Sequence, residues 1–222
     1  MRKLILIVVA VFVAVSLNAQ IGVKVGYGLS KLSVDNPDEN TKMSKGLTIG
    51  AVYEKNLVGE IIGVRVEGLY TQKGYDYYNK TEILGAQNIT DFSVSVDYIE
   101  IPVLAKVKVG PIYGVAGPYF GIAIKGEQLG TSESSFLGVT TVTDIQDDLF
   151  SSDNSLDPVL YKKTDFGIQA GLGYEFGLPF AKAFLEARAG IGMSDLNEIE
   201  SESDDYSKNL AFNLSVGILL GR

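Results

Sequence analysis

The chain has 222 residues and a formal net charge of −8, and it contains neither histidine nor cysteine. An acidic chain has no electrostatic basis for binding nucleic acid. Without histidine or cysteine, Ser-His-Asp hydrolysis, Cys-His catalysis and zinc sites built on those ligands are excluded. We therefore expect a protein that is not an enzyme and carries no cofactor and no metal.

The first 19 residues have the pattern of a secretory signal peptide. Arg2 and Lys3 precede an apolar stretch from Leu4 to Val15, and Ala19 supplies a small residue before Gln20. We expect two parts, a signal peptide at 1–19 and a single β-barrel domain at 20–222. Loss of the two cations would lower the net charge from −8 to −10. An exported chain without cysteine must fold without disulfides.

Eight segments alternate apolar and polar residues with a period of two, which predicts strands with one oily and one wet face. In chain order they cover 20–30, 46–54, 61–72, 98–109, 112–125, 163–176, 182–191 and 209–220. The segment at 98–109 is the clearest, with Ile99, Ile101 and Val103 on one face and Glu100 and Lys106 on the other. A tilted strand of about 9–11 residues crosses a bilayer. The length therefore favours membrane strands.

The connections alternate between long and short. Long polar stretches follow the first, third, fifth and seventh segments, and we expect them to be loops, including an irregular stretch at about 126–162. Short turns follow the second, fourth and sixth segments. Long loops on one side, short turns on the other and an even number of strands are typical of outer-membrane barrels. We predict an eight-stranded antiparallel up-and-down transmembrane β-barrel. A soluble periplasmic ligand-binding barrel, with the oily faces inside, stays open as an alternative.

The wet faces carry charges that would meet inside a narrow barrel and fill it. The residues expected in this lumen charge network are Arg65, Glu67, Glu100, Lys106, Glu175, Lys182, Glu186 and Arg188. A four-residue turn at 177–180 would place Glu175 opposite Lys182, Gly171 opposite Glu186 and Gln169 opposite Arg188. A structural network is favoured over a site for a ligand head group.

Two prolines stand inside predicted strands, Pro102 and Pro118. Because each removes a ladder donor, we expect a bulge or an interrupted ladder at their level.

Aromatic and acidic residues in the long connections allow two readings each. Tyr75, Tyr77 and Tyr78 could form a recognition patch, and an interfacial aromatic girdle is favoured. Acidic residues in the third and fourth long connections could hold calcium, but they lack EF-hand spacing, and a solvated acidic surface is favoured. They are Asp144, Asp147, Asp148, Asp153, Asp157, Glu198, Glu200, Glu202, Asp204 and Asp205.

Several segments together resemble the PorT-like outer-membrane β-barrel family of Bacteroidetes. They read YIEIPVLAKV from Tyr98, GPYFGI from Gly117, KTDFGIQAGLGYEF from Lys163, FLEARAGIGMSDL from Phe184 and KNLAFNLSVGILL from Lys208. The most specific parts are Glu100-Ile101-Pro102 and Leu185-Glu186-Ala187-Arg188. The resemblance implies an eight-stranded barrel in the outer membrane, and some family members take part in type IX secretion or gliding.

We therefore expect an integral protein of the Gram-negative outer membrane, monomeric, in contact with membrane lipid. Its lumen would be plugged by side chains, and its role would be structural or the presentation of external loops. An accessory subunit of a type IX secretion or gliding machinery is the alternative from a different class, which would add envelope or secretion proteins as partners.

Overall fold

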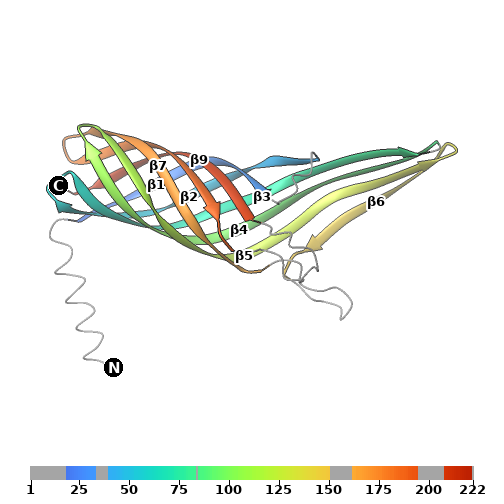
Figure 1. The fold of residues 1–222 in the computed structure, drawn as a ribbon, viewed down its shortest axis with the longest axis horizontal. Helices are drawn as coiled ribbons and strands as arrows, with labels where there is room; N and C mark the ends of the chain where they lie inside the picture. The colour runs from blue at the N-terminus through green and yellow to red at the C-terminus, as the bar shows by residue number, and fades with distance from the viewer. Residues whose placement is uncertain (1–18, 34–39, 84, 151–161, 195–207, 222) are drawn as a thin grey trace, which may run out of the picture.

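The computed structural model describes residues 19–33, 40–83, 85–150, 162–194 and 208–221, and the predicted signal peptide lies outside these residues apart from Ala19. The described residues form nine strands in one antiparallel sheet (Figure 1). The strands are β1 (Ala19–Ser33), β2 (Thr41–Val58), β3 (Ile62–Ile83), β4 (Ala86–Val109), β5 (Ile112–Phe136), β6 (Val139–Asp148), β7 (Thr164–Gly177), β8 (Ala181–Gly192) and β9 (Lys208–Leu220). No helix in these ranges is both long and apolar enough to cross a membrane.

Eight of the nine strands close into a ring. Each barrel strand pairs with its neighbour, and the ring closes where β9 pairs with β1 from Ile21–Leu220 to Ser33–Lys208. Strand β6 stands outside the ring and, within the part of the chain that the structure describes, pairs with β5 alone. The tight turns at 59–61, 110–111 and 178–180 lie at the same end of the barrel as the C-terminus (Figure 1). The prediction of an eight-stranded up-and-down barrel is confirmed.

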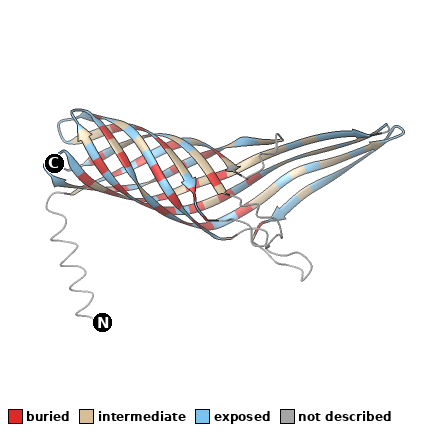
Figure 2. Cartoon of the chain, in the orientation of Figure 1, coloured by how far each residue is buried: buried red, intermediate tan, exposed pale blue. Residues whose placement is uncertain are grey.

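The alternation of the sequence becomes an alternation between the outside and the lumen. On β4, Ile99 is 43% exposed and its neighbour Glu100 is 2% exposed. Buried and exposed residues alternate along every strand of the ring (Figure 2). Leu185 and Leu214 likewise face outward, while Arg188 is buried. The soluble barrel is therefore wrong, because it requires the oily faces inside.

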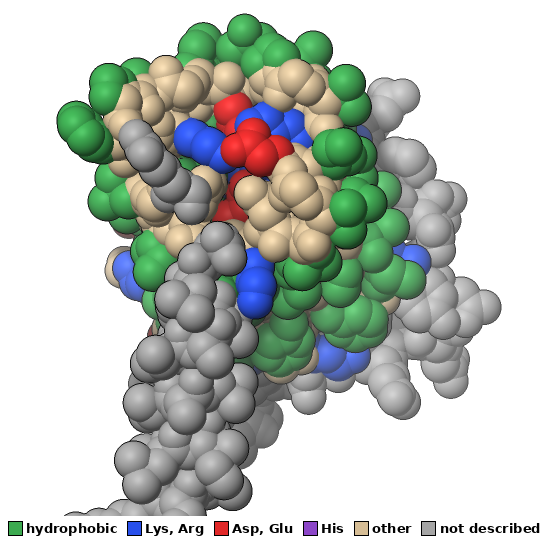
Figure 3. Space-filling view, turned by 90° about the vertical axis from the view of Figure 1, so that its left-hand side faces the viewer, with side chains coloured by type: hydrophobic (Ala, Val, Ile, Leu, Met, Phe, Trp, Pro, Cys, Tyr) green, Lys and Arg blue, Asp and Glu red, His purple; other side chains and the backbone are tan. Residues whose placement is uncertain are grey.

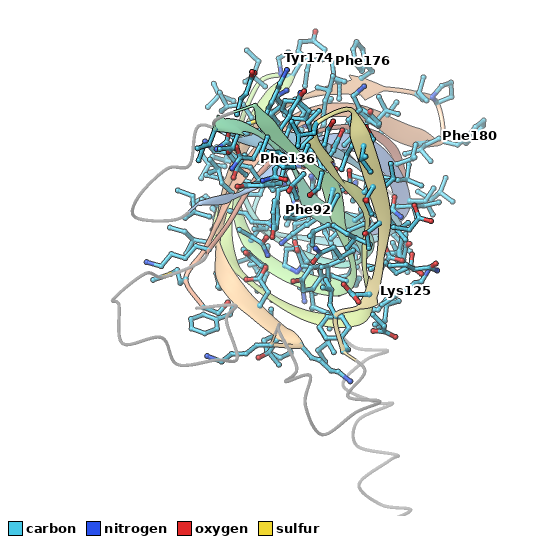
Figure 4. All side chains as sticks on the ribbon, turned by 90° about the vertical axis from the view of Figure 1, so that its right-hand side faces the viewer. Phe92, Lys125, Phe136, Tyr174, Phe176 and Phe180 are labelled. Carbon is cyan, nitrogen blue, oxygen red and sulfur yellow. The ribbon has the colours of Figure 1, made fainter. Side chains whose placement is uncertain are left out.

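The outward face of β7 shows how the apolar band is bounded. Its residues run Phe166, Ile168, Ala170, Leu172, Tyr174 and Phe176. Aromatic side chains thus flank an aliphatic centre, and Tyr174 and Phe176 project from the periphery of the ring (Figure 4). Ten steps of about 3.4 Å, tilted by about 45°, span roughly 25 Å, the height of the apolar band in outer-membrane barrels.

The tyrosines expected in this girdle lie elsewhere. Tyr75 and Tyr77 sit on the lumen-side face of β3, where Tyr77 stacks on Phe92 at 4.9 Å between ring centroids. Tyr75 meets the same ring edge-on at 6.3 Å. Tyr78 faces outward beside Lys42, whose Nζ lies 5.6 Å from its ring. The girdle assignment is wrong for Tyr75 and Tyr77, because both lie on the face that continues the lumen.

Three barrel strands continue well beyond the ring, so two of the expected loops are sheet. We call residues 74–83, 86–96, 126–136 and 139–148 the external sheet; its strands pair in register along their whole length (Figure 1). The expectation of irregular structure at 73–97 and 126–148 is wrong. Apart from Val94 and Val96, which are buried at the mouth of the barrel, most residues of this sheet are partly or fully exposed on both faces, so the apolar-polar alternation of the barrel strands is largely lost.

The prolines interrupt the ladders without shifting them. Pairing of β4 with β5 runs to Ala105–Ala116 and resumes at Pro102–Tyr119 in the same register. The β3–β4 ladder is likewise interrupted between Val66–Val103 and Leu69–Glu100. A proline cannot donate to the ladder, so the interrupted pairing is confirmed. The bulge of this hairpin lies further out, at Asp97–Tyr98.

The predicted pairing of β7 with β8 is wrong by two residues. The structure pairs Gly177 with Lys182, Gly173 with Glu186 and Gly171 with Arg188. The turn is tighter than expected, with Leu178 N–H donating to the carbonyl of Ala181. A shift of two leaves every side chain on its predicted face, because the side-chain period is two.

Substituting arginine at two exposed apolar positions, one expected to face lipid and the other to face water, tests where the bilayer lies. Leu172 is 69% exposed at the middle of the apolar band, and Val142 is 59% exposed on the external sheet. We expect L172R to lower the free energy of unfolding by about 2–4 kcal/mol and V142R to change it by less than about 0.5 kcal/mol. Urea titration in phospholipid vesicles measures both, and equal effects would contradict the placement of the band.

Candidate functional site: the lumen charge network

Charged side chains from six of the barrel strands meet inside the ring. Seen along the barrel from its turn end, acidic and basic groups fill the centre, surrounded by backbone and then by apolar side chains (Figure 3). The buried charges of the described residues, with Lys108 at the turn end, are Lys24, Arg65, Lys73, Lys106, Lys108, Arg188, Glu54, Glu67, Glu100, Asp165, Glu175 and Glu186. Six cations thus face six carboxylates, so the lumen is electroneutral.

Arg65 on β3 is the largest of the fully buried side chains. It makes ion pairs of 2.6 Å with Glu54 and 2.6 Å with Glu186. Its guanidinium carbon lies 4.8 Å from the ring centroid of Tyr113 and 5.0 Å from that of Phe184. The cation is therefore held by carboxylates and by aromatic faces, which both favour its charged form.

Two glycines make room for those aromatic rings. A Cβ on Gly173 would stand 2.2 Å from Tyr113, and one on Gly217 would stand 2.3 Å from Phe184. No side chain other than hydrogen fits at such distances. Gly173 on β7 pairs directly with Tyr113, and Gly217 on β9 pairs with Phe184, so each ring lies over a neighbour that has no side chain. Both glycines are thus required by the packing around Arg65.

The middle of the lumen holds four charges in one cluster. Arg188 makes ion pairs of 2.8 Å with Glu67 and 2.5 Å with Glu186. Lys24 contacts the same two carboxylates at 3.3 Å and 3.1 Å. Each carboxylate therefore pairs with at least two cations, and the four side chains come from three strands, β1, β3 and β8.

Towards the external sheet, Gln169 links this cluster to another. Arg188 donates to the Oε1 of Gln169 at 3.1 Å, and the amide of Gln169 donates to Glu100. Lys73 bridges Glu100 at 2.8 Å and Asp165 at 3.1 Å. Further donors complete Asp165: Tyr119 at 3.2 Å, Ser194 at 2.9 Å and Asn209 at 2.8 Å.

At the turn end the network reaches the rim. Lys106 pairs with both Glu54 and Glu175, and Lys108 lies 2.6 Å from Glu175 and 3.5 Å from Glu60. Glu60, in the β2–β3 turn, is exposed to water. Lys182 and Lys108 beside it hold the pKa of its carboxyl below its ordinary value. Hydrogen bonds and ion pairs thus run without a break from Glu60 to Asp165.

Of the eight residues expected in the network, seven are buried in the lumen, and Lys182 lies at the rim, where it pairs with Glu60 at 3.5 Å instead of with Glu175. The residues expected from the sequence did not include Lys24, Glu54, Lys73 and Asp165. All but Lys73 stand on the polar face of a predicted strand, so strict use of parity would have included them. Lys73 fell in an expected loop and had no such signal.

The space left between these side chains is small. A cavity of about 50 Å³ lies beside Lys73, Arg188 and Asn213. It has room for a few waters, whereas ligand pockets typically measure about 300–1,000 Å³. At the outer mouth an apolar cluster of Val94, Val96, Tyr98, Ala123 and Leu149 covers the network.

The acidic residues considered for calcium do not form such a site where the structure describes them. Asp144, Asp147 and Asp148 belong to β6 rather than to a loop. Within the described ranges, no three acidic side chains are placed to hold a metal ion. Asp153, Asp157 and the five acidic residues at 198–205 lie outside the described residues.

A closed ring with an apolar outer band and a charged interior defines an integral β-barrel protein of the bacterial outer membrane. The sequence agrees: residues 15–198 match the model of the family described as outer membrane protein beta-barrel domain. The chain belongs to this family. No curated protein matches the chain significantly.

Solved structures with a similar strand arrangement are small outer-membrane barrels. They include Ail, the attachment invasion locus protein of Yersinia pestis, solved with the heparin analogue sucrose octasulfate (14% identity, TM-score 0.41, 92% of this chain and 100% of that one). Neisserial surface protein A is 14% identical with a TM-score of 0.41, and the match covers 92% of this chain and 99% of that one. OprG from Pseudomonas aeruginosa is 13% identical with a TM-score of 0.41, and the match covers 91% of this chain and 95% of that one.

Removing one carboxylate of the network should leave buried cations without a partner. We expect E186Q to lower the free energy of unfolding by about 3–5 kcal/mol, because Arg65, Arg188 and Lys24 all lose a counter-charge. The matched control is E60Q at the exposed rim, for which we expect less than about 1 kcal/mol. Urea unfolding of the barrel in vesicles measures both. Similar losses for the two variants would contradict a tightly coupled interior.

Proposed function

We propose that this protein is a closed, non-enzymatic barrel that anchors the external sheet at the cell surface and presents it to a partner. The observation that carries the proposal is the continuity of β3, β4 and β5 through the membrane band into that sheet. Anchoring in the membrane requires only the barrel. A sheet that continues the barrel strands outside the membrane supports a second role, which is contact with other molecules.

The lumen supports a closed barrel rather than a channel. The charge network fills the cross-section between the turn end and Asp165, and the apolar cluster with Leu149 lies over its outer mouth. An ion crossing the barrel would have to break several buried ion pairs at once. The network is therefore proposed to be structural, with Arg65, Glu67, Glu100, Lys106, Glu175, Glu186 and Arg188 as its central members.

An accessory subunit of a type IX secretion or gliding machinery is the second candidate, carried by the PorT-like resemblance. The most specific segments of that resemblance, Glu100-Ile101-Pro102 and Leu185-Glu186-Ala187-Arg188, lie in β4 and β8 of the barrel. The resemblance therefore concerns the membrane part and leaves the external sheet free to differ. Affinity purification from native membranes separates the candidates: stable envelope or secretion partners favour the machinery, and a lone barrel argues against it.

Closure of the lumen predicts an electrically silent protein. Reconstituted into a planar bilayer, the wild-type barrel should give no steady conductance at moderate voltage, because its interior is filled by paired charges. Insertion is checked independently by resistance to carbonate extraction of the same vesicles. A large, persistent pore in correctly inserted protein would contradict the proposal.

The sheet should be reachable from outside the cell. Because the chain has no cysteine, single cysteines report position cleanly. We expect Val139→Cys, at the tip of the external sheet, to react with a bulky maleimide polymer on intact cells. The control Phe180→Cys, in the β7–β8 turn, should react only after the outer membrane is permeabilised. Both side chains are strongly exposed, so the reversed pattern would overturn the orientation.

A further inference from the structure

Strand β6 forms one edge of the external sheet. Among the described residues it pairs with β5 alone, from Phe136–Val139 to Glu127–Asp148, and stands last in the strand order. Its ten residues are nearly all exposed. A strand of this length leaves a row of backbone donors and acceptors unpaired along its outer side, which is a template for a further strand.

The hairpin turn shows which residues turn their backbone groups outward. Leu137 and Gly138 connect β5 and β6 with φ values of 50° and 81°, both positive as in a two-residue turn of type I′. The residues flanking such a turn, Phe136 and Val139, form a hydrogen-bonded pair, and the pattern then alternates. The backbone groups aimed at the free edge belong to Thr140, Val142, Asp144, Gln146 and Asp148.

The edge lacks the usual protection against pairing. Natural proteins guard such strands with charged side chains, above all lysine, and with proline, bulges or short length. The only charges of β6 are the aspartates Asp144, Asp147 and Asp148. Strand β6 reads VTTVTDIQDD, is rich in β-branched residues, and keeps a continuous register with β5. On the opposite side of the sheet, by contrast, β3 carries Lys80 in the part beyond its last β2 pair at Tyr77. The chemistry of β6 therefore favours the addition of a strand.

The charge of the external sheet indicates what kind of partner strand would bind at the β6 edge. The face of the external sheet that continues the outside of the barrel carries carboxylates from all four strands: Asp76, Glu82, Asp91, Glu127, Glu133, Asp144 and Asp148. Within the residues of the external sheet, Lys80 is the sole cation on that face. At its borders, Lys42 of β2 stands opposite Asp76, and Lys125 pairs with Glu127. Glu127 also stands directly opposite Asp148, and like charges so placed repel each other.

We propose that the free edge of β6 binds an extended segment of a partner protein that carries lysine or arginine at every second position. The inference rests on the proposed role of the external sheet. Cationic side chains would lie beside Asp144 and Asp148 on the acidic face. The residues between them would lie beside Thr141, Thr143 and Ile145, where β-branched side chains pack best. A second copy of this chain is disfavoured, because it would bring one acidic face against another.

A peptide as long as β6, alternating lysine with threonine or valine, tests the proposal on the full-length barrel in lipid nanodiscs. We expect saturable binding by fluorescence anisotropy that weakens as salt rises, since the charges are exposed. Two control peptides should bind at least about tenfold more weakly. One has glutamate in place of lysine, and the other is N-methylated on the amides that face β6.

Two variants locate the site. V142P removes an N–H aimed at the free edge and keeps the β5 ladder, so it should abolish peptide binding. V142T keeps the N–H and should bind as the wild type does. Circular dichroism and the barrel's gel mobility without heating verify that both fold. D144K with D148K should reverse the preference towards the glutamate peptide.

Three results would overturn the proposal. The first is equal binding of the N-methylated peptide, which would reduce the edge to a nonspecific acidic surface. The second is binding unaffected by V142P. The third is strong protection of the amides of Thr140, Val142 and Asp144 from hydrogen exchange in the isolated protein, which would mean that the chain's own residues at 151–161, or a second copy, already occupy the edge. Surface labelling at Val139→Cys and the conductance measurement are independent of all three, so failure of the edge and failure of the presentation role remain distinguishable.

Discussion

The structure depends on the obligation of every backbone N–H and C=O in hydrocarbon to find a partner within the protein. A sheet meets this obligation only by closing on itself, and here it closes through the pairing of β1 with β9. Closure makes an inside and an outside, and the two-residue period of each strand then sends alternate side chains to lipid and to the lumen. The apolar band and the charged interior are two consequences of one ring.

An eight-stranded ring leaves an interior only as wide as its side chains. Charged groups placed there lose water, and their burial is tolerable only when each is paired. The network contains equal numbers of cations and carboxylates. Some carboxylates pair with several cations, as Glu186 does with Lys24, Arg65 and Arg188. Gly173 and Gly217 lie directly across from Tyr113 and Phe184 on the neighbouring strands and leave room for these rings to contact Arg65.

Beyond the membrane the obligation is relaxed, because water satisfies an unpaired backbone group. The same strands continue there as an open sheet with a free edge at β6 and two faces of different character. One face extends the outside of the barrel and is acidic; the other extends the lumen and carries Ser, Thr and Asn above the stacked rings of Tyr77 and Phe92. A protein that only filled the membrane would have no need of such an extension.

The sequence by itself determined which side of each barrel strand faces lipid, because alternation such as Ile99-Glu100-Ile101 survives any shift of register by two. It also determined the strand number, the closed architecture and the polar faces that supply the lumen charges. Tertiary structure alone decided which charges meet: the pairing of Gly171 rather than Gln169 with Arg188, the inclusion of Lys73 and the place of Lys182 at the rim beside Glu60 depend on register and on turn length. It alone also decided that residues 74–96 and 126–148 are sheet, because apart from Val94 and Val96 most of this sheet meets water on both faces and lacks the hydrophobic alternation of a barrel strand.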